Sequence, residues 1–245
     1  MITASAQVKA ELAPHGVLRA AINMGNFLLV TGRSPNGDPT GCSPDMAYGI
    51  ACVLGVPVQY IPYARPGELA DDAGTDKWDI GLIGAEPQRA QKIDFTAAYV
   101  EIEATYLVPA GSPIQSIDQV DRAGNRIAVT ARAAYDLWLE RNIKNAQLIR
   151  GNNQGETIKL FQDQKMEALA GLRPGLLGDL EKMPGARILD GQFTAVQQAI
   201  GTAKTNTAGA AFLKAYVEHA KKSGIVASLL EKHGTVGRLS VAPPG

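Results

Sequence analysis

The chain has 245 residues, of which 45% are hydrophobic and 20% are charged, and its 24 basic side chains are balanced by 24 acidic ones. This length is enough for one large or two small domains, each with a hydrophobic core. A net charge of zero argues against general binding to nucleic acid or to anionic membranes. No apolar run approaches the roughly 18 residues that a membrane-spanning helix needs.

The first third of the chain alternates between strand and helix patterns. Residues 17–23 (VLRAAIN) and 56–63 (VPVQYIPY) are predicted strands, and residues 43–54 form a predicted helix between them. Strand, helix and strand in this order indicate a parallel crossover. A short helix over residues 68–73 precedes the next strand, which begins at Trp78.

Residues 78–99 (WDIGLIGAEPQRAQKIDFTAAY) carry the most distinctive pattern of the chain. Their apolar run ends at Gly84, turns through Ala85 and reaches Arg89. We interpret this pattern as a strand that leads into the N-terminus of a helix. Backbone N–H groups and a planar guanidinium would together bind an anion there, most simply a carboxylate.

The second half repeats the alternation. A long extended run over residues 100–112 is expected to contain a hinge at residues 106–109. Further strands are predicted at 126–130, 146–151, 167–172 and 193–201, and helices at 131–143, 156–165 and 174–183. Two helices, 208–224 and 225–234, each end in glycine and are expected to pack back on the first lobe.

Open α/β sheets bind ligands at the carboxyl ends of their strands. The candidate ligand-binding residues are therefore those that follow predicted strands: Asn26, Phe27, Gly84, Ala85 and Arg89 in the first lobe, and Thr130, Arg132, Ala133 and Arg173 in the second. Phe27 fits equally well as a core residue of the first lobe.

Several chemistries lack a signature. The histidines His15, His219 and His233 are far apart, and no Cys/His ligand spacing occurs, so neither a metal nor a cofactor is expected. There is no P-loop, no G-x-S-x-G and no G-x-G-x-x-G motif. Cys42 and Cys52 lie about 15 Å apart along one predicted helix, so both are expected to be free thiols.

The segments WDIGLIG, PQR and KIDFTAAY resemble the central signature of bacterial extracellular solute-binding proteins of family 3, the polar amino-acid type. The resemblance extends from Gly16 to Gly234. It implies an α/β, two-lobed periplasmic-binding-protein-like fold of type II, in which each lobe is a mostly parallel sheet flanked by helices and two hinge strands join the lobes. Lobe one would comprise residues 1–107 and 197–245, and lobe two residues 108–196.

The resemblance also implies a function. The chain would be the substrate-binding protein of an ABC-type uptake system and would close its hinge on a small carboxylate or amino-acid-like anionic ligand in the interlobe cleft. Arg89 would hold the ligand carboxylate, and Phe27 would cover the ligand. An ABC permease is the implied partner, with neither nucleic acid nor membrane insertion involved. A periplasmic location is implied, but residues 1–16 lack the apolar region of a signal peptide, so a cytoplasmic location stays open.

The chain departs from the family pattern at the turn before Arg89 and after the first strand of lobe two. The turn between Gly84 and Pro87 is two residues short, and Glu86 replaces a Thr or Ser that normally helps to hold the carboxylate. In lobe two, Arg132 and Ala133 stand where amino-acid binders usually have Gly-Thr.

A third departure concerns the ligand ammonium. Amino-acid binders have an Asp shortly before a Pro that pairs with the ammonium, whereas this chain has Arg173 there. A buried ammonium without a carboxylate costs several kcal/mol. We therefore expect a net anionic ligand, unless Glu103, Glu86 or Asp136 takes the place of the missing acid.

Two other functions remain open from the sequence. One is a lyase or dehydratase on the same fold, with Glu103 or Glu86 as a general acid whose pKa is raised near a buried arginine. The other is a ligand sensor without a role in transport.

Overall fold

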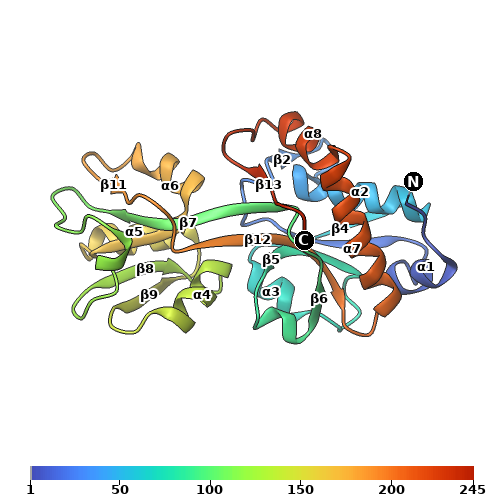
Figure 1. Cartoon of the computed structure of the whole chain (residues 1–245), viewed down its shortest axis with the longest axis horizontal. Helices are drawn as coiled ribbons and strands as arrows, with labels where there is room; N and C mark the ends of the chain where they lie inside the picture. Colours follow the sequence, from blue (N-terminus) through green and yellow to red (C-terminus); the bar gives the residue numbers. More distant parts are fainter. Residues whose placement is uncertain (1) are drawn as a thin grey trace. The chain divides into compact units, whose positions relative to one another are not determined.

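The computed structural model describes residues 2–245. The chain divides into two compact units: unit 1 is the chain up to Glu101 together with Gln197–Gly245, and unit 2 is Ile102–Val196. The chain enters unit 2 within β7 (Val100–Val108) and leaves it within β12 (Thr194–Ala203), as the colours in Figure 1 show. The sequence placed these divisions after residues 107 and 196.

The sheet of unit 1 contains three parallel strands. They are β4 (Val58–Tyr63), β1 (Leu18–Asn23) and β5 (Ile80–Ala85), in that order, and β12 lies antiparallel beside β5. The carboxyl ends of the three parallel strands therefore meet at one edge. The loops that follow β1 and β5 both begin at this edge, which carries the predicted site residues of the first lobe.

Among its described residues, five further helices and four short strands complete unit 1. They are α1 (Ala6–Leu12), α2 (Cys42–Leu54), α3 (Pro66–Asp71), α7 (Thr207–Lys222) and α8 (Ile225–Lys232), with β2 (Gly32–Arg33), β3 (Pro39–Thr40), β6 (Ile93–Phe95) and β13 (Ser240–Val241). In α2 the apolar positions Met46, Ile50 and Leu54 are fully buried. Gly55 then ends the helix in the left-handed conformation, so the predicted helix is confirmed.

Unit 2 follows the same plan. The strands β9 (Gln147–Gly151), β8 (Arg126–Thr130) and β10 (Ala168–Leu172) are parallel, and β7 is antiparallel to β10. The short strand β11 (Arg187–Ile188) pairs with β7, and the helices are α4 (Ala134–Asn142), α5 (Gln154–Asp163) and α6 (Arg173–Leu180), with a 3₁₀ turn η2 at Ile117–Gln119.

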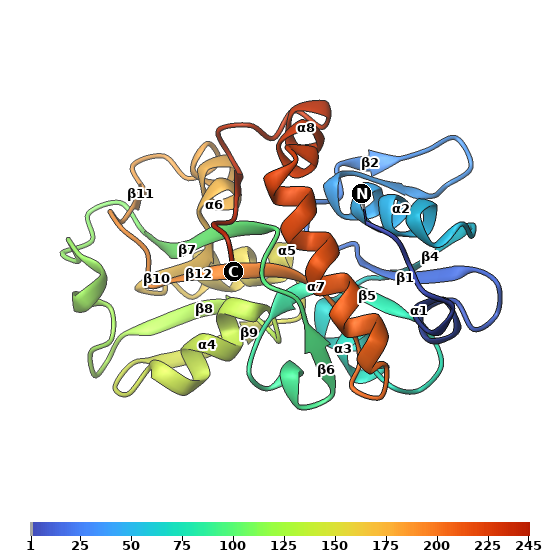
Figure 2. The same cartoon turned by 45° about the vertical axis from the view of Figure 1, so that its right-hand side comes forward.

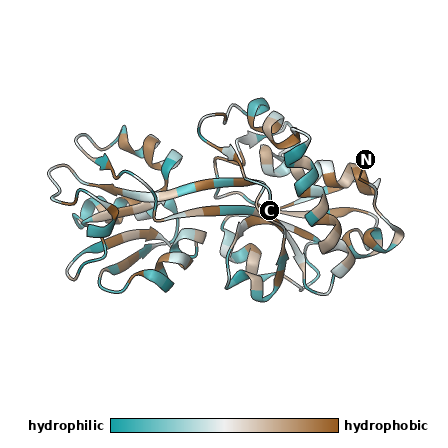
Figure 3. Ribbon diagram, in the orientation of Figure 1, coloured by the Kyte–Doolittle hydropathy of each residue, from teal (hydrophilic) through white to brown (hydrophobic). Residues whose placement is uncertain are grey.

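Successive side chains of the unit 2 strands pack on opposite faces of the sheet. Ile127 and Val129 belong to the same cluster as Leu139 of α4, whereas Ala128 packs in a second cluster with Phe161 of α5. Both faces are therefore covered, as is usual for parallel sheets. Helices such as α7 carry both hydrophilic and hydrophobic residues (Figure 3), as expected of helices that cover a sheet.

The helix predicted at Arg89 is wrong. The chain instead forms one 3₁₀ turn, η1 (Arg89–Gln91), and returns to the sheet as β6 at Ile93. The amide of Ala90 donates to the Glu86 carbonyl over 2.8 Å. A three-residue turn has no long column of aligned peptide dipoles, so a helix macrodipole does not contribute to anion binding here.

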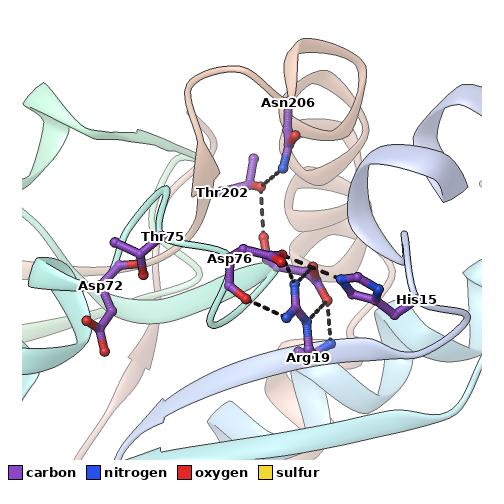
Figure 4. Close-up of polar contacts among 8 residues, drawn as sticks. His15, Arg19, Asp72, Thr75, Asp76, Thr202 and Asn206 are labelled. Carbon is purple, nitrogen blue, oxygen red and sulfur yellow. Dashed lines mark hydrogen bonds and ion pairs between the residues drawn. The ribbon is translucent and has the colours of Figure 1, made fainter.

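A buried ion pair joins the strands of unit 1 at the edge opposite the predicted site (Figure 4). Arg19, at the start of β1, donates from Nε and Nη2 to Asp79, directly before β5, over 3.1 and 2.8 Å. The Asp79 carbonyl accepts from Thr202 of β12, which in turn accepts from Asn206 over 2.9 Å. The side chain of Asp76 adds an exposed carboxylate to Arg19 over 2.8 Å.

Candidate functional site

Arg89 lies at the carboxyl edge of the unit 1 sheet, immediately after β5. It is only 5% exposed, and its Nη1 donates to the Gly84 carbonyl over 2.8 Å. This hydrogen bond fixes the direction of the guanidinium at the end of the strand. A planar guanidinium held in this way matches the geometry of a carboxylate better than a flexible ammonium does.

The loop after β1 begins at the same edge and is held by Asn26. The Asn26 Oδ1 accepts from the amides of Leu28 and Leu29 over 3.1 and 3.3 Å, which forms an Asx turn. Asn26 thus uses its carbonyl oxygen to shape the loop. Phe27 is 75% exposed, so the alternative that it belongs to the core of the first lobe is wrong.

A close approach between Gly41 and this loop fixes its position. Gly41 has φ = +147°, and a Cβ on it would lie 2.2 Å from the Leu29 carbonyl oxygen. The same carbonyl accepts from the Ser43 amide at the start of α2 over 3.1 Å. Only glycine allows this contact, which anchors the loop on α2 while Phe27 projects from it.

Two glutamines opposite the end of β5 were not among the predicted site residues. Gln197 and Gln198 of β12 lie opposite Ala85 and Gly84 in the antiparallel register, and Gln198 is buried. Since they are successive residues of one strand, their side chains point to opposite faces of the sheet beside the end of β5. The adjacent glutamines within the predicted strand 193–201 were the available signal, but the strand that pairs with them was not predictable from it.

In unit 2, the predicted residues also meet at one carboxyl edge, since β8 and β10 are parallel, with Ala168 opposite Ile127. Thr130 ends β8, and its Oγ1 forms hydrogen bonds with Gln154 Oε1 and Thr157 Oγ1, both over 3.1 Å. The hydroxyl of Thr130 is therefore engaged within unit 2.

Arg132 follows Thr130 with a left-handed backbone, φ = +60°. Its amide donates to Asp136 Oδ2 over 2.8 Å, and Arg150 Nε lies 2.9 and 3.1 Å from the two carboxylate oxygens of Asp136. Burial raises the pKa of Asp136, against the opposing effect of these two donors. Ala133 completes the turn as the N-cap of α4, which is why this helix begins three residues later than predicted.

Arg173 is the first residue of α6, and its charge is compensated inside unit 2. Its Nε donates to Glu103 Oε2 over 2.6 Å, and its Nη2 donates to the Gly191 carbonyl. Glu103 is exposed, so the burial on which its expected role as a general acid depended is absent. Asp136 has both carboxylate oxygens engaged, so it does not replace the acid missing from this edge.

Residues 2–245 contain no group of three His, Cys, Asp or Glu side chains that could hold a metal ion. Cys42 is buried and Cys52 is exposed, and both are free thiols as predicted. Burial raises the pKa of Cys42 to about 12. Across the described part of the chain, no helix combines the length and the apolar character that crossing a membrane requires.

Solved structures of amino-acid-binding proteins share this fold. The solute receptor for L-cysteine of Neisseria gonorrhoeae is 18% identical, covers 98% of this chain and 100% of its own, and has a TM-score of 0.78. The ancestral amino acid-binding protein AncCDT-1, a precursor of cyclohexadienyl dehydratase, is 20% identical, with coverages of 93% and 99% and a TM-score of 0.75. A mutant of ArgBP from T. maritima is 19% identical, with the same coverages and TM-score. The predicted two-lobed α/β fold class is confirmed.

Among curated proteins, none is similar enough in sequence to count as a relative. The profile of bacterial extracellular solute-binding proteins, family 3, matches residues 25–236, which is most of the chain and includes the Arg89 motif. The chain therefore belongs to family 3 of the bacterial extracellular solute-binding proteins.

Proposed function

We propose that this protein is the substrate-binding component of an ABC-type uptake system and that its ligand is a small carboxylate. Membership of the family supports a role in solute binding. Among the similar structures is the substrate binding protein of an amino acid ABC transporter, at 20% identity. The observation that carries the proposal is the buried guanidinium of Arg89, oriented by the Gly84 carbonyl at the carboxyl edge of the sheet.

In this proposal, Arg89 binds the ligand carboxylate through parallel N–H···O hydrogen bonds. Phe27 leaves the same edge on an anchored loop and supplies an exposed ring to cover the apolar part of the ligand. Gln198, opposite Gly84 in β12, offers an amide near the same position. These three side chains come from separate loops and strands, so together they can select both charge and shape.

Unit 2 supports a ligand without an ammonium group. Arg132 brings an exposed cationic side chain to the edge of unit 2. The acids near that edge already bind arginines: Asp136 holds Arg150, and Glu103 holds Arg173. An ammonium bound there would lose its water without gaining a carboxylate, at a cost of several kcal/mol. We therefore propose a net anionic ligand.

The two chain passages in β7 and β12 would serve as hinges. A ligand held first by Arg89 would gain contacts from Arg132 when the units close on it, and these extra contacts would favour the closed state. The closed form would then deliver the ligand to a membrane permease. In keeping with the family, we place this activity outside the cytoplasm.

A thermal-shift screen tests the proposal. The probes are amino acids, dicarboxylates, aromatic acids, sulfonates and phosphates. A ligand at 100 times its Kd adds about 2.7 kcal/mol to the free energy of unfolding, which raises Tm by about 5–10 °C for a chain of this size. We expect a carboxylate without an ammonium group to produce this shift, and we expect Arg89→Ala to abolish it.

The matched control is Arg122→Ala, which removes an exposed arginine that precedes β8 and should keep the full shift. If Arg89→Ala does not fold, Arg89→Lys retains the charge without the fork and should lose most of the shift. A full shift in the Arg89 variants would overturn the site. A shift with zwitterionic amino acids alone would overturn the anionic ligand class but leave the site intact.

A further inference from the structure

Arg150 lies on β9, beside the turn that carries Arg132 in unit 2. In the parallel pairing of β8 and β9, Arg150 is opposite Val129. The Ala131 amide donates to the Gly151 carbonyl over 2.8 Å, so the turn after β8 is held against the end of β9. The helix α4, which follows this turn, lies next to β8 and β9 in both Figure 1 and Figure 2.

Asp136, in the first turn of α4, links Arg150 to this turn. Its side chain is only 3% exposed. Its Oδ2 accepts from the Arg132 amide over 2.8 Å and from Arg150 Nε over 3.1 Å, and its Oδ1 lies 2.9 Å from the same Nε. One buried carboxylate therefore holds the left-handed backbone of Arg132, and Arg150 compensates the charge of that carboxylate.

The other ionisable groups beside Asp136 do not replace Arg150. Burial raises the pKa of Asp136, the Arg132 amide and Arg150 oppose this rise, and Glu140 of α4 adds to it. Burial also raises the pKa of the neighbouring Tyr135 to about 12, so its hydroxyl is neutral. Without Arg150, Asp136 would be a buried carboxylate beside another acid, and such a group takes up a proton more readily.

We propose that Arg150 is a positioning residue of the candidate site: it keeps Asp136 ionised, and the ionised carboxylate fixes the backbone turn that presents Arg132. Contact between Arg132 and a ligand rests on the proposed function, whereas the control of its backbone does not. Arg150 acts through Asp136, since its Nε faces Asp136 and its Nη2 lies 3.5 Å from Glu140. A protonated carboxyl accepts a hydrogen bond more weakly than a carboxylate, so loss of Arg150 makes the turn sensitive to pH.

The test follows the Arg132 amide of the full chain by NMR between pH 6 and 9, without any ligand. In the wild type we expect a slowly exchanging amide proton at low field, with a shift that is constant over this range. Arg150→Met should move the proton upfield, most strongly at pH 6, and should make its exchange about tenfold faster, because the charged acceptor is lost. Arg150→Lys keeps a cation and should restore most of the wild-type behaviour.

Two further variants separate positioning from a general loss of structure. The double variant Arg150→Met/Asp136→Asn keeps a carbonyl oxygen that can accept from the Arg132 amide but has no group that titrates, so the pH dependence should disappear. Arg122→Ala removes an exposed arginine that precedes β8 and should leave the Arg132 amide unchanged. If Arg150→Met does not fold, folding of the double variant supports the proposal, because the uncompensated carboxylate is then the cause; failure of both would overturn it.

A wild-type Arg132 amide in Arg150→Met at every pH would overturn the proposal, as would a pH dependence that persists in the double variant. In the thermal screen, the carboxylate probe that stabilises the wild type should give Arg150→Met a smaller shift at pH 6 than at pH 9, and equal, full shifts would overturn the link to the ligand. If no carboxylate stabilises the wild type, the proposed function fails, but the NMR result still decides the role of Arg150.

Discussion

At the residue scale, Arg132 has a backbone conformation that an L-residue adopts at a cost of about 1–2 kcal/mol. The Asp136 carboxylate, itself held by Arg150, accepts the Arg132 amide and enforces this conformation. Backbone strain of this kind is typical of functional loops. We predict that Arg132→Gly is more stable than Arg132→Ala by about 1 kcal/mol, because both lose the guanidinium but only glycine relieves the backbone.

Urea denaturation of the two variants measures this difference, and the ligand found in the thermal screen provides a second readout. Both variants should bind that ligand equally weakly, since neither carries the Arg132 side chain. Equal unfolding free energies for the two variants would show that the backbone at residue 132 is not strained.

At the scale of elements, the Arg19–Asp79 pair joins β1, β5 and β12 of unit 1. We predict that Asp79→Ala lowers the free energy of unfolding by about 3–5 kcal/mol, because it leaves the largely buried Arg19 without its main partner. The exposed carboxylate of Asp76, which binds the same arginine, provides the matched control. Its side chain is 74% exposed, so Asp76→Ala should cost less than about 1 kcal/mol.

The losses in the free energy of unfolding are measured by urea denaturation of the two aspartate variants at the same pH and salt concentration. Equal losses in Asp79→Ala and Asp76→Ala would mean that burial does not control the strength of this pair.

At the scale of the whole molecule, the chain crosses between its units twice, in β7 and β12. We predict that a saturating ligand reduces the radius of gyration measured by small-angle X-ray scattering, because contacts from both units favour a closed state. Arg89→Ala should keep the ligand-free value at the same ligand concentration. Thermal stabilisation without any change in the radius of gyration would contradict closure and leave ligand binding by Arg89 standing.

Local pattern alone determined much of the fold. The apolar spacing of α2 and the glycine that ends it predicted that helix, and the run at residues 126–130 predicted β8. The Arg89 motif also placed this arginine correctly after a strand, because the motif is contiguous in sequence. By contrast, α1 went unpredicted: it is seven residues long and depends on α7, where Gly209 N donates to Glu11 Oε2 over 2.6 Å.

Only the tertiary structure decided the remaining features, since each depends on residues far apart in the chain. The segment after Arg89 became a strand because β6 pairs with β12, with Phe95 opposite Gly201. Arg173 pairs with Glu103, which is 70 residues away in the chain, and this pairing compensates the charge of the arginine. The contact between α2 and α8 joins Asp45 to Lys232, 187 residues away in the chain. Periodicity reports which face of an element is buried, but it carries no information about which distant partner covers that face.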